Sequence, residues 1–330
     1  MKRFIFIIIL AISLLSCIKN KENHNIEMAR LSSLKPSFTQ SELFQNLQAY
    51  NDSIFNANLY TKLTPSGRNA IVASADVIGL MNGWSDGSNI GFWAGWFLGN
   101  PVAGKILGGV LGGAAVAVAY SVLVNKNITV SEIKTVDEMY EDTMNSIILS
   151  GQLDCINIKS DGTISFDLIQ IDSLLPVVLP ENNNEAIFIS QSHNKSIHIM
   201  LEQELHTKNT IQTDKIDKID KIDERVLNIL YSNEIKELFT ENYNYCVNNI
   251  DNLSTESLLR LDKTGIGGMI VNLYLQLHDS YVMDTEDSIE ITNQYIQIIN
   301  TSNELTNEEK KLVISALTLA SYSTDLWTNL

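Results

Sequence analysis

Apolar residues recur at three- and four-residue spacing along most of the chain, which is the pattern of amphipathic helices. The first such stretch follows Thr39-Gln40-Ser41-Glu42, which has the form of a capping box, and its apolar face includes Leu43 and Phe55. The last begins at a second capping box, Thr306-Asn307-Glu308-Glu309. Between them the pattern predicts helices at about 131–150, from 192 onward, and at 225–248, 266–282, 286–301 and 306–325.

A different pattern occurs near the middle of the chain. Cys155 to Ile158 and Thr163 to Phe166 alternate between apolar and polar residues around Ser160-Asp161-Gly162. Alternation on both sides of a turn sequence is typical of a β-hairpin. The expected fold is therefore mainly α, a helical bundle containing a glycine-spaced helical hairpin, to which residues 155–167 add one short β-hairpin.

Glycine is concentrated in one apolar segment, where it recurs every four residues. Glycine inside a helix costs about 0.5–1 kcal/mol relative to alanine, so close approach of another helix is expected to offset that cost. The predicted helix-packing glycines are Gly79, Gly83, Gly87, Gly91, Gly95, Gly99, Gly104, Gly108 and Gly112.

The glycine spacing also limits how a partner helix can lie. Four residues turn a helix by about 400°, so successive glycines are displaced by roughly 40°, and the ridge from Gly79 to Gly99 winds by roughly 200°. A single straight partner cannot follow such a ridge. We expect either steeply crossing partners that each touch two or three glycines, or several surrounding helices, as in an oligomer.

The same segment is expected to form a helical hairpin that turns near Pro101, because proline interrupts a helix. Ile106 to Val124 gives 19 uncharged residues, enough to cross a hydrocarbon core of about 30 Å. Trp84, Trp93 and Trp96 lie in the first arm, and tryptophan favours a bilayer boundary. Two interpretations stay open: a hairpin that inserts into a membrane or self-associates, and a hairpin buried in a soluble helical core.

The N-terminus predicts export. Lys2 and Arg3 precede an apolar run from Phe4 to Leu15, the form of a secretory signal. Leu14-Leu15-Ser16-Cys17 resembles the lipobox of bacterial lipoproteins, in which the cysteine is acylated and becomes the new N-terminus. That resemblance implies lipidation of Cys17 and stable anchoring. The expected segments are a signal peptide (1–16), the lipidated cysteine and tether (17–36), an N-terminal helix with the hairpin (37–124), and a mostly helical C-terminal module (125–330).

Charge is unevenly distributed along the chain. The formal net charge is −16, and the acidic excess lies in residues 125–330. A strongly acidic module argues against nucleic acid as a partner, because phosphates require a basic face. The expected partners are a lipid membrane through acylated Cys17 and a second copy of the chain through the glycine zipper.

Few residues indicate specific chemistry. Cys155 and Cys246 either form a disulfide or are two buried thiols. His193 and Asn194 follow Ser192, a sequence that suits a helix cap or, alternatively, a ligand site. No catalytic or metal-binding motif is found in the sequence, so no cofactor, no metal and no enzymatic activity are expected.

Two resemblances complete the sequence-based interpretation. Residues 75–115 resemble glycine-zipper segments of bacterial envelope proteins and of small bacteriocin-type peptides. The segments around Ser192-His193-Asn194 and from Ser315 to Trp327 are similar to uncharacterised lipoproteins of Bacteroidetes-type bacteria, which implies an outer-membrane location, periplasmic or surface-exposed. We therefore expect a non-enzymatic envelope lipoprotein. The alternatives are a bacteriocin-like or pore-forming toxin and a lipid-tethered soluble binding module.

Overall fold

A computed structural model describes residues 41–58, 68–94, 100–128, 134–167, 177–205, 217–249, 265–280 and 285–329. Within these ranges the protein is mainly helical, which confirms the expected fold class. The helices are α3 (Glu42–Asn58), α4 (Arg68–Ala94), α5 (Pro101–Ile128), α6 (Val136–Leu149), α7 (Asn184–Leu205), α9 (Glu224–Leu230), α10 (Asn233–Asn249), α12 (Gly265–Ser280), α13 (Thr285–Thr301) and α14 (Asn307–Asn329). A short 3-10 helix, η1 (Leu153–Cys155), precedes the two strands β1 (Ile156–Ile158) and β2 (Ile164–Phe166).

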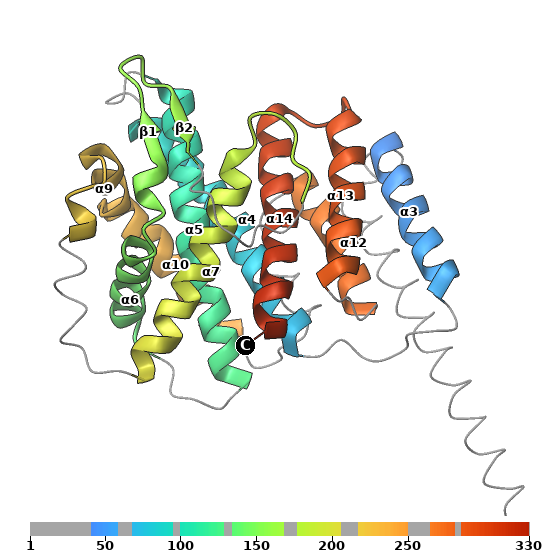
Figure 1. Ribbon diagram of the computed structural model, residues 1–330, viewed down its shortest axis with the longest axis horizontal. Coiled ribbons are helices and arrows are strands. Elements are labelled where there is room, and N and C mark those ends of the chain that lie inside the picture. The colour runs from blue at the N-terminus through green and yellow to red at the C-terminus, as the bar shows by residue number, and fades with distance from the viewer. Residues whose placement is uncertain are drawn as a thin grey trace, which may run out of the picture.

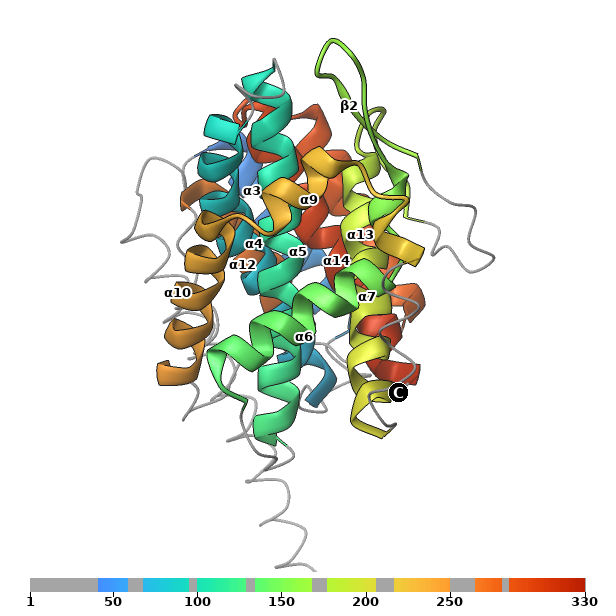
Figure 2. The same ribbon diagram turned by 90° about the vertical axis from the view of Figure 1, so that its left-hand side faces the viewer.

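The expected helical hairpin occupies the middle of the bundle. α4 and α5 pack along each other, and α5 also contacts α6, α7, α9 and α10. Figure 2 shows α5 in the centre, with α10 on one side and α7 on the other. The turn is where the sequence placed it: Asn100 Oδ1 accepts a hydrogen bond from Ala103 N (3.1 Å), so Asn100 caps α5 and Pro101 takes the first helical position.

A second group of helices covers the other side of α4. α14 contacts α4, α7, α12 and α13, and α3 contacts α12 and α13. In Figure 1 these helices run from α14 near the middle to α3 at one edge. One hydrophobic core extends from Leu43 in α3 to Trp327 in α14, so segments 37–124 and 125–330 pack as one unit across the described residues.

The β-hairpin prediction is confirmed. β1 and β2 are antiparallel, with Ile156 opposite Phe166 and Ile158 opposite Ile164. Gly162 in the turn has a φ of 77°, a conformation that L-residues rarely adopt. Asp161 Oδ1 accepts a hydrogen bond from Thr163 N (2.9 Å), which closes the turn and, through that bond, lowers the pKa of the carboxyl.

Two helix boundaries differ from the sequence-based prediction because of a local cap. The helix expected at 131–150 has Thr135 and Glu138 as its capping box and begins at Val136. The helix expected at 225–248 is two helices, since Ser232 Oγ accepts from Ile235 N (3.2 Å) and starts a new one. The capping box at Thr306 and Glu309 is confirmed.

The helix expected from residue 192 begins earlier, at Asn184. Asn182 has a positive φ of 66° and ends the preceding loop, and the backbone of Asn183 accepts from Ala186 N. His193 and Asn194 therefore lie inside α7. The expectation that they cap a helix start is wrong, because the polar run at 182–184 contains both the loop and the start of the helix.

Candidate functional site

The glycines of α4 face the backbone of α5. A Cβ added to Gly79 would lie 2.8 Å from Ala117 Cα, and one added to Gly112 would lie 2.7 Å from the carbonyl oxygen of Gly83. Real side chains essentially never approach backbone atoms so closely. The contact requires glycine at these positions, as small-xxx-small packing predicts. The same test identifies Gly79, Gly83, Gly87, Gly91, Gly108 and Gly112 as sites of close backbone approach.

Successive glycines of α4 meet successive glycines of α5 in antiparallel order. Gly83 meets Gly112, Gly87 meets Gly108, and Gly91 meets the backbone of Gly104. Four glycines of α4 thus contact one partner, which corrects the expectation of two or three per partner. That expectation assumed a straight partner. Here the contact advances by four residues at a time on both arms, so the line of contact winds around each helix. On α4 this line turns by about 120° from Gly79 to Gly91.

A second glycine row on α5 accepts side chains of α4. A Cβ on Gly109 would lie 3.0 Å from Trp84 Cε2, and one on Gly113 would lie 2.5 Å from Leu80 Cδ1. The Trp84 ring, which is buried, therefore lies against the bare backbone of α5. Gly95 and Gly99, like Cys17, lie outside the described residues.

A fully buried carboxylate lies in α4, where the hairpin meets α7 and α14. Asp76 Oδ2 accepts hydrogen bonds from Ser323 Oγ and from Trp327 Nε1 (3.3 Å), both on α14. His193 Nε2 on α7 lies 3.5 Å from Asp76 Oδ1. Asp76 and His193 are both 0% exposed. Burying a carboxylate is costly unless other groups compensate its charge, and here three side chains surround it.

The hydrogen bonds of Asn194 determine the tautomer of His193. Asn194 Nδ2 donates to the carbonyl oxygen of Tyr322 (2.9 Å), so its Oδ1 is the atom that faces His193 Nδ1 (2.9 Å). An amide oxygen only accepts, and Nδ1 therefore carries a proton. Nε2 then faces Asp76 Oδ1 at 3.5 Å, and neither of these two atoms has a hydrogen-bond partner.

These contacts define what we call the Asp76 cluster: Asp76, His193, Asn194, Ser323 and Trp327. It joins α4 to α7 and α14. The sequence singled out His193 and Asn194, and the structure gives them partners that the sequence did not predict. Asp76 was missed as a site residue. The available signal was a single acidic residue in an apolar helical stretch, from Ile71 to Met81.

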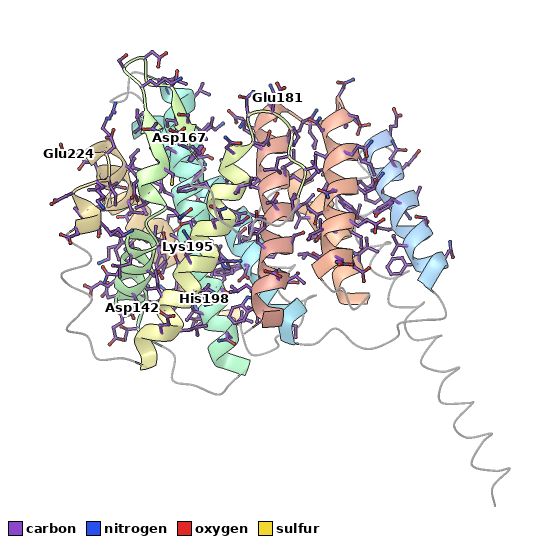
Figure 3. The ribbon with its side chains drawn as sticks, in the orientation of Figure 1. Asp142, Asp167, Glu181, Lys195, His198 and Glu224 are labelled. Atoms are coloured by element: carbon purple, nitrogen blue, oxygen red, sulfur yellow. The ribbon has the colours of Figure 1, made fainter. Side chains whose placement is uncertain are left out.

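The other histidine described on α7 does not join this cluster. His198 is exposed, whereas His193 is buried. Figure 3 shows His198 and Lys195 on α7. Burial lowers the pKa of Lys195. Within the described residues, no group of three or more acidic, histidine or cysteine side chains is arranged to hold a metal ion.

The two cysteines expected either to pair or to be buried thiols form no disulfide and are both buried. Cys155 ends η1, and Cys246 lies in α10. Burial raises the pKa of the Cys246 thiol to about 12, so this sulfur is protonated at neutral pH.

Acidic side chains of the C-terminal part lie on several elements rather than in one place. Figure 3 labels Asp142 on α6, Asp167 after β2, Glu181 before α7 and Glu224 on α9. Their separation gives a broadly acidic exterior instead of a single charged site.

α5 is the one helix in the described residues that is long and apolar enough to cross a membrane. The span is Pro101–Asn125, with a mean hydropathy of 2.0, and 94% of its most apolar window is buried inside the fold. Core helices of soluble proteins have the same length and composition.

No family model matches the chain, and neither a curated protein nor a solved structure matches it significantly.

Proposed function

We propose that this chain is an exported, non-enzymatic lipoprotein that holds a helical module at the cell envelope through acylated Cys17. The basic start, the apolar run and Leu14-Leu15-Ser16-Cys17 favour export and lipidation. In this proposal the lipid is the membrane anchor, and the glycine hairpin is the internal core of the module.

The burial of α5 is the observation that carries this assignment. A helix that contacted lipid in the resting protein would leave much of its surface uncovered by protein. Instead, 94% of the apolar window of α5 is buried among the surrounding helices. The glycines described above are likewise occupied by the opposite arm of the same chain, which favours an internal role over one in self-association.

A binding or structural role fits the buried polar groups better than catalysis does. Asp76 and His193 have no exposed surface and face protein side chains, so substrate cannot reach them in this state. The broadly acidic exterior fits a module that stands clear of an anionic membrane surface.

Fractionation of an unlipidated protein tests the proposal. The chain from residue 17, with Cys17→Ala, is exported behind an unrelated leader that is removed without lipidation. We expect it in the soluble fraction and the wild-type lipoprotein in the membrane fraction. Retention of the Cys17→Ala protein in membranes after carbonate washing would show that the hairpin itself is inserted.

A further inference from the structure

We propose that the Asp76 cluster is a latch that retains the apolar hairpin inside the bundle, and that opening this latch delivers the hairpin to a lipid bilayer. The inference rests on the proposed function, because acylated Cys17 would place the module within reach of a membrane.

The hairpin is able to leave the bundle as a unit. Its two arms contact each other through their own backbones, at Gly83–Gly112 and Gly87–Gly108. At Gly83, Gly87 and Gly108 the nearest atoms all belong to the opposite arm, whereas a Cβ on Gly112 would also lie 3.5 Å from Leu238 Cδ1 of α10. Separation from α7, α10 and α14 would therefore leave the pairing of α4 with α5 intact, and helices paired through glycines are compatible with lipid.

The composition of α5 also suits a bilayer. Lys105 is the one charged side chain between Asp86 and Val124. α5 has the length and hydropathy of a membrane span. The backbone of both helices is satisfied internally, which a bilayer requires. A lipid bilayer is thus a solvent in which the hairpin could exchange its protein surroundings for acyl chains.

The carboxylates of α4 are what oppose this exchange. Asp76 is bound by Ser323 and Trp327 of α14 and lies beside His193 of α7. Asp86 Oδ2 accepts a hydrogen bond from Asn242 Nδ2 of α10 (3.2 Å). Ionised groups enter a bilayer at a high cost, so these polar contacts hold α4 to the bundle at the points where lipid would not replace them.

The packing around the hairpin is less favourable on the side of α7, because polar atoms are buried there without hydrogen bonds. Buried atoms of Gln191, Ser192 and Ser196 on this helix have no hydrogen-bond partner. Unsatisfied polar groups weaken the packed state. Asp76 Oδ1 and His193 Nε2 likewise have no hydrogen-bond partner, so on this side retention of the hairpin rests on the two hydrogen bonds that Asp76 Oδ2 accepts from α14.

The test uses the unlipidated chain from residue 17 with Cys17→Ala, mixed with vesicles of phosphatidylcholine and phosphatidylglycerol. Asp76→Asn keeps the size and acceptor oxygen of the side chain but removes its charge. We expect at least a tenfold increase in the fraction that sediments with the vesicles, and a blue shift of tryptophan emission. Trp327→Phe, which removes one hydrogen bond to Asp76 Oδ2, should give a smaller increase and serves if Asp76→Asn does not fold.

A matched control separates latch opening from general loss of stability. Thr292→Val breaks a buried network between α12, α13 and α14, in which Thr292 Oγ1 contacts Tyr274 OH (2.9 Å) and Ser321 Oγ (2.6 Å) and which includes no residue of the Asp76 cluster. We expect this variant to stay in the supernatant although its melting temperature is lowered. The latch proposal would be wrong if Thr292→Val sedimented with vesicles as much as Asp76→Asn does. It would also be wrong if Asp76→Asn or Trp327→Phe folded but did not sediment with vesicles. Sedimentation of the parent chain would instead contradict the proposed function.

Discussion

The helices within the two halves of the bundle pack by opposite means. Along α4 and α5, contact depends on missing side chains, and backbone meets backbone at the glycines. Among α3, α12, α13 and α14, contact depends on large polar aromatic residues: Tyr295 OH donates to Asn51 Oδ1 (2.6 Å), and Tyr274 OH contacts Thr292 Oγ1. Tyr274 and Tyr295 also pack edge to face, with ring centroids 5.3 Å apart.

This contrast shows that one core can combine two kinds of specificity. The glycine contact tolerates no added atom, because a neighbouring helix axis would have to move. The tyrosine contact tolerates little loss of polarity, because each hydroxyl satisfies another buried group. The two regions should therefore fail under different perturbations.

The largest loss of stability is expected at high pH. Alkali ionises buried side chains in the tyrosine region and in α10, whereas the glycine contacts contain no ionisable side chain. Burial raises the pKa of Tyr50, Tyr243 and Tyr322 from 10.0 to about 12, and that of Cys246 from 9.0 to about 12. The fold prefers the protonated forms. Their contribution to stability is present below pH 9 and is lost as the pH rises from 9 to 12.

We therefore expect cooperative unfolding in this pH range, with helix circular dichroism and tyrosinate absorbance changing together. Cys246→Ala should move the alkaline midpoint upward, because it removes one of the groups that titrate. Full ionisation of the tyrosines with the helical signal retained would contradict the assignment of these residues to the core.

The next largest effect is expected at the glycine contact. A Cβ on Gly87 would lie 3.0 Å from the carbonyl carbon of Gly108 and 3.3 Å from Gly112 Cα. Gly87→Ala should lower the free energy of unfolding by an amount near the upper end of about 1–3 kcal/mol, measured by urea denaturation.

Gly267→Ala is the matched control for that variant. A Cβ there would meet flexible side-chain ends, Val313 Cγ2 at 3.3 Å and Met81 Cε at 3.4 Å. We expect a much smaller loss than at Gly87, because these contacts are with side-chain methyl groups rather than backbone and alanine is the better helix former. Equal losses at Gly87 and Gly267 would mean that backbone contact is not what distinguishes the hairpin.

A smaller effect is expected from Tyr295→Phe. The change removes the hydroxyl that donates to Asn51 Oδ1, while Asn51 Nδ2 still donates to the carbonyl oxygen of Leu273 (3.0 Å). The loss should be about 1 kcal/mol in thermal or chemical denaturation. Tyr231→Phe, at a side chain that is 44% exposed, provides the comparison and should change stability little.

The smallest effect is expected from Lys105→Met, which keeps the aliphatic stem but removes the charge. Lys105 pairs with Glu308 at the surface between α5 and α14. Exposed ion pairs contribute about 0–1 kcal/mol, and salt screens them. Wild type and variant should converge in stability at high salt. A loss that persisted at high salt would point to packing instead.

The sequence predicted the parts of this fold that have a local cause. The glycine register, the turn at Pro101, the β-hairpin and the cap at Thr306 each depend on neighbouring residues. How many glycines meet one partner depends on the path of the partner arm, and the expectation of two or three was wrong.

The Asp76 cluster was not predictable from spacing. Its members come from α4, α7 and α14, and Asp76 is 247 residues from Ser323 in sequence. The polar character of each residue was visible, but only the packing of three helices brings them together. His193 and Asn194 were predicted from a local pattern, that of a helix cap, but both residues lie inside α7 rather than at its start.

The two buried thiols have a consequence for handling and turnover. Cys155 and Cys246 are sealed from solvent in the folded protein. In an oxidising compartment, each excursion to an open state would expose sulfur to oxidants, and molecules modified there could not repack the same volumes. In such a compartment, the oxidised fraction of Cys155 and Cys246 would therefore increase with the number of times that the protein has opened.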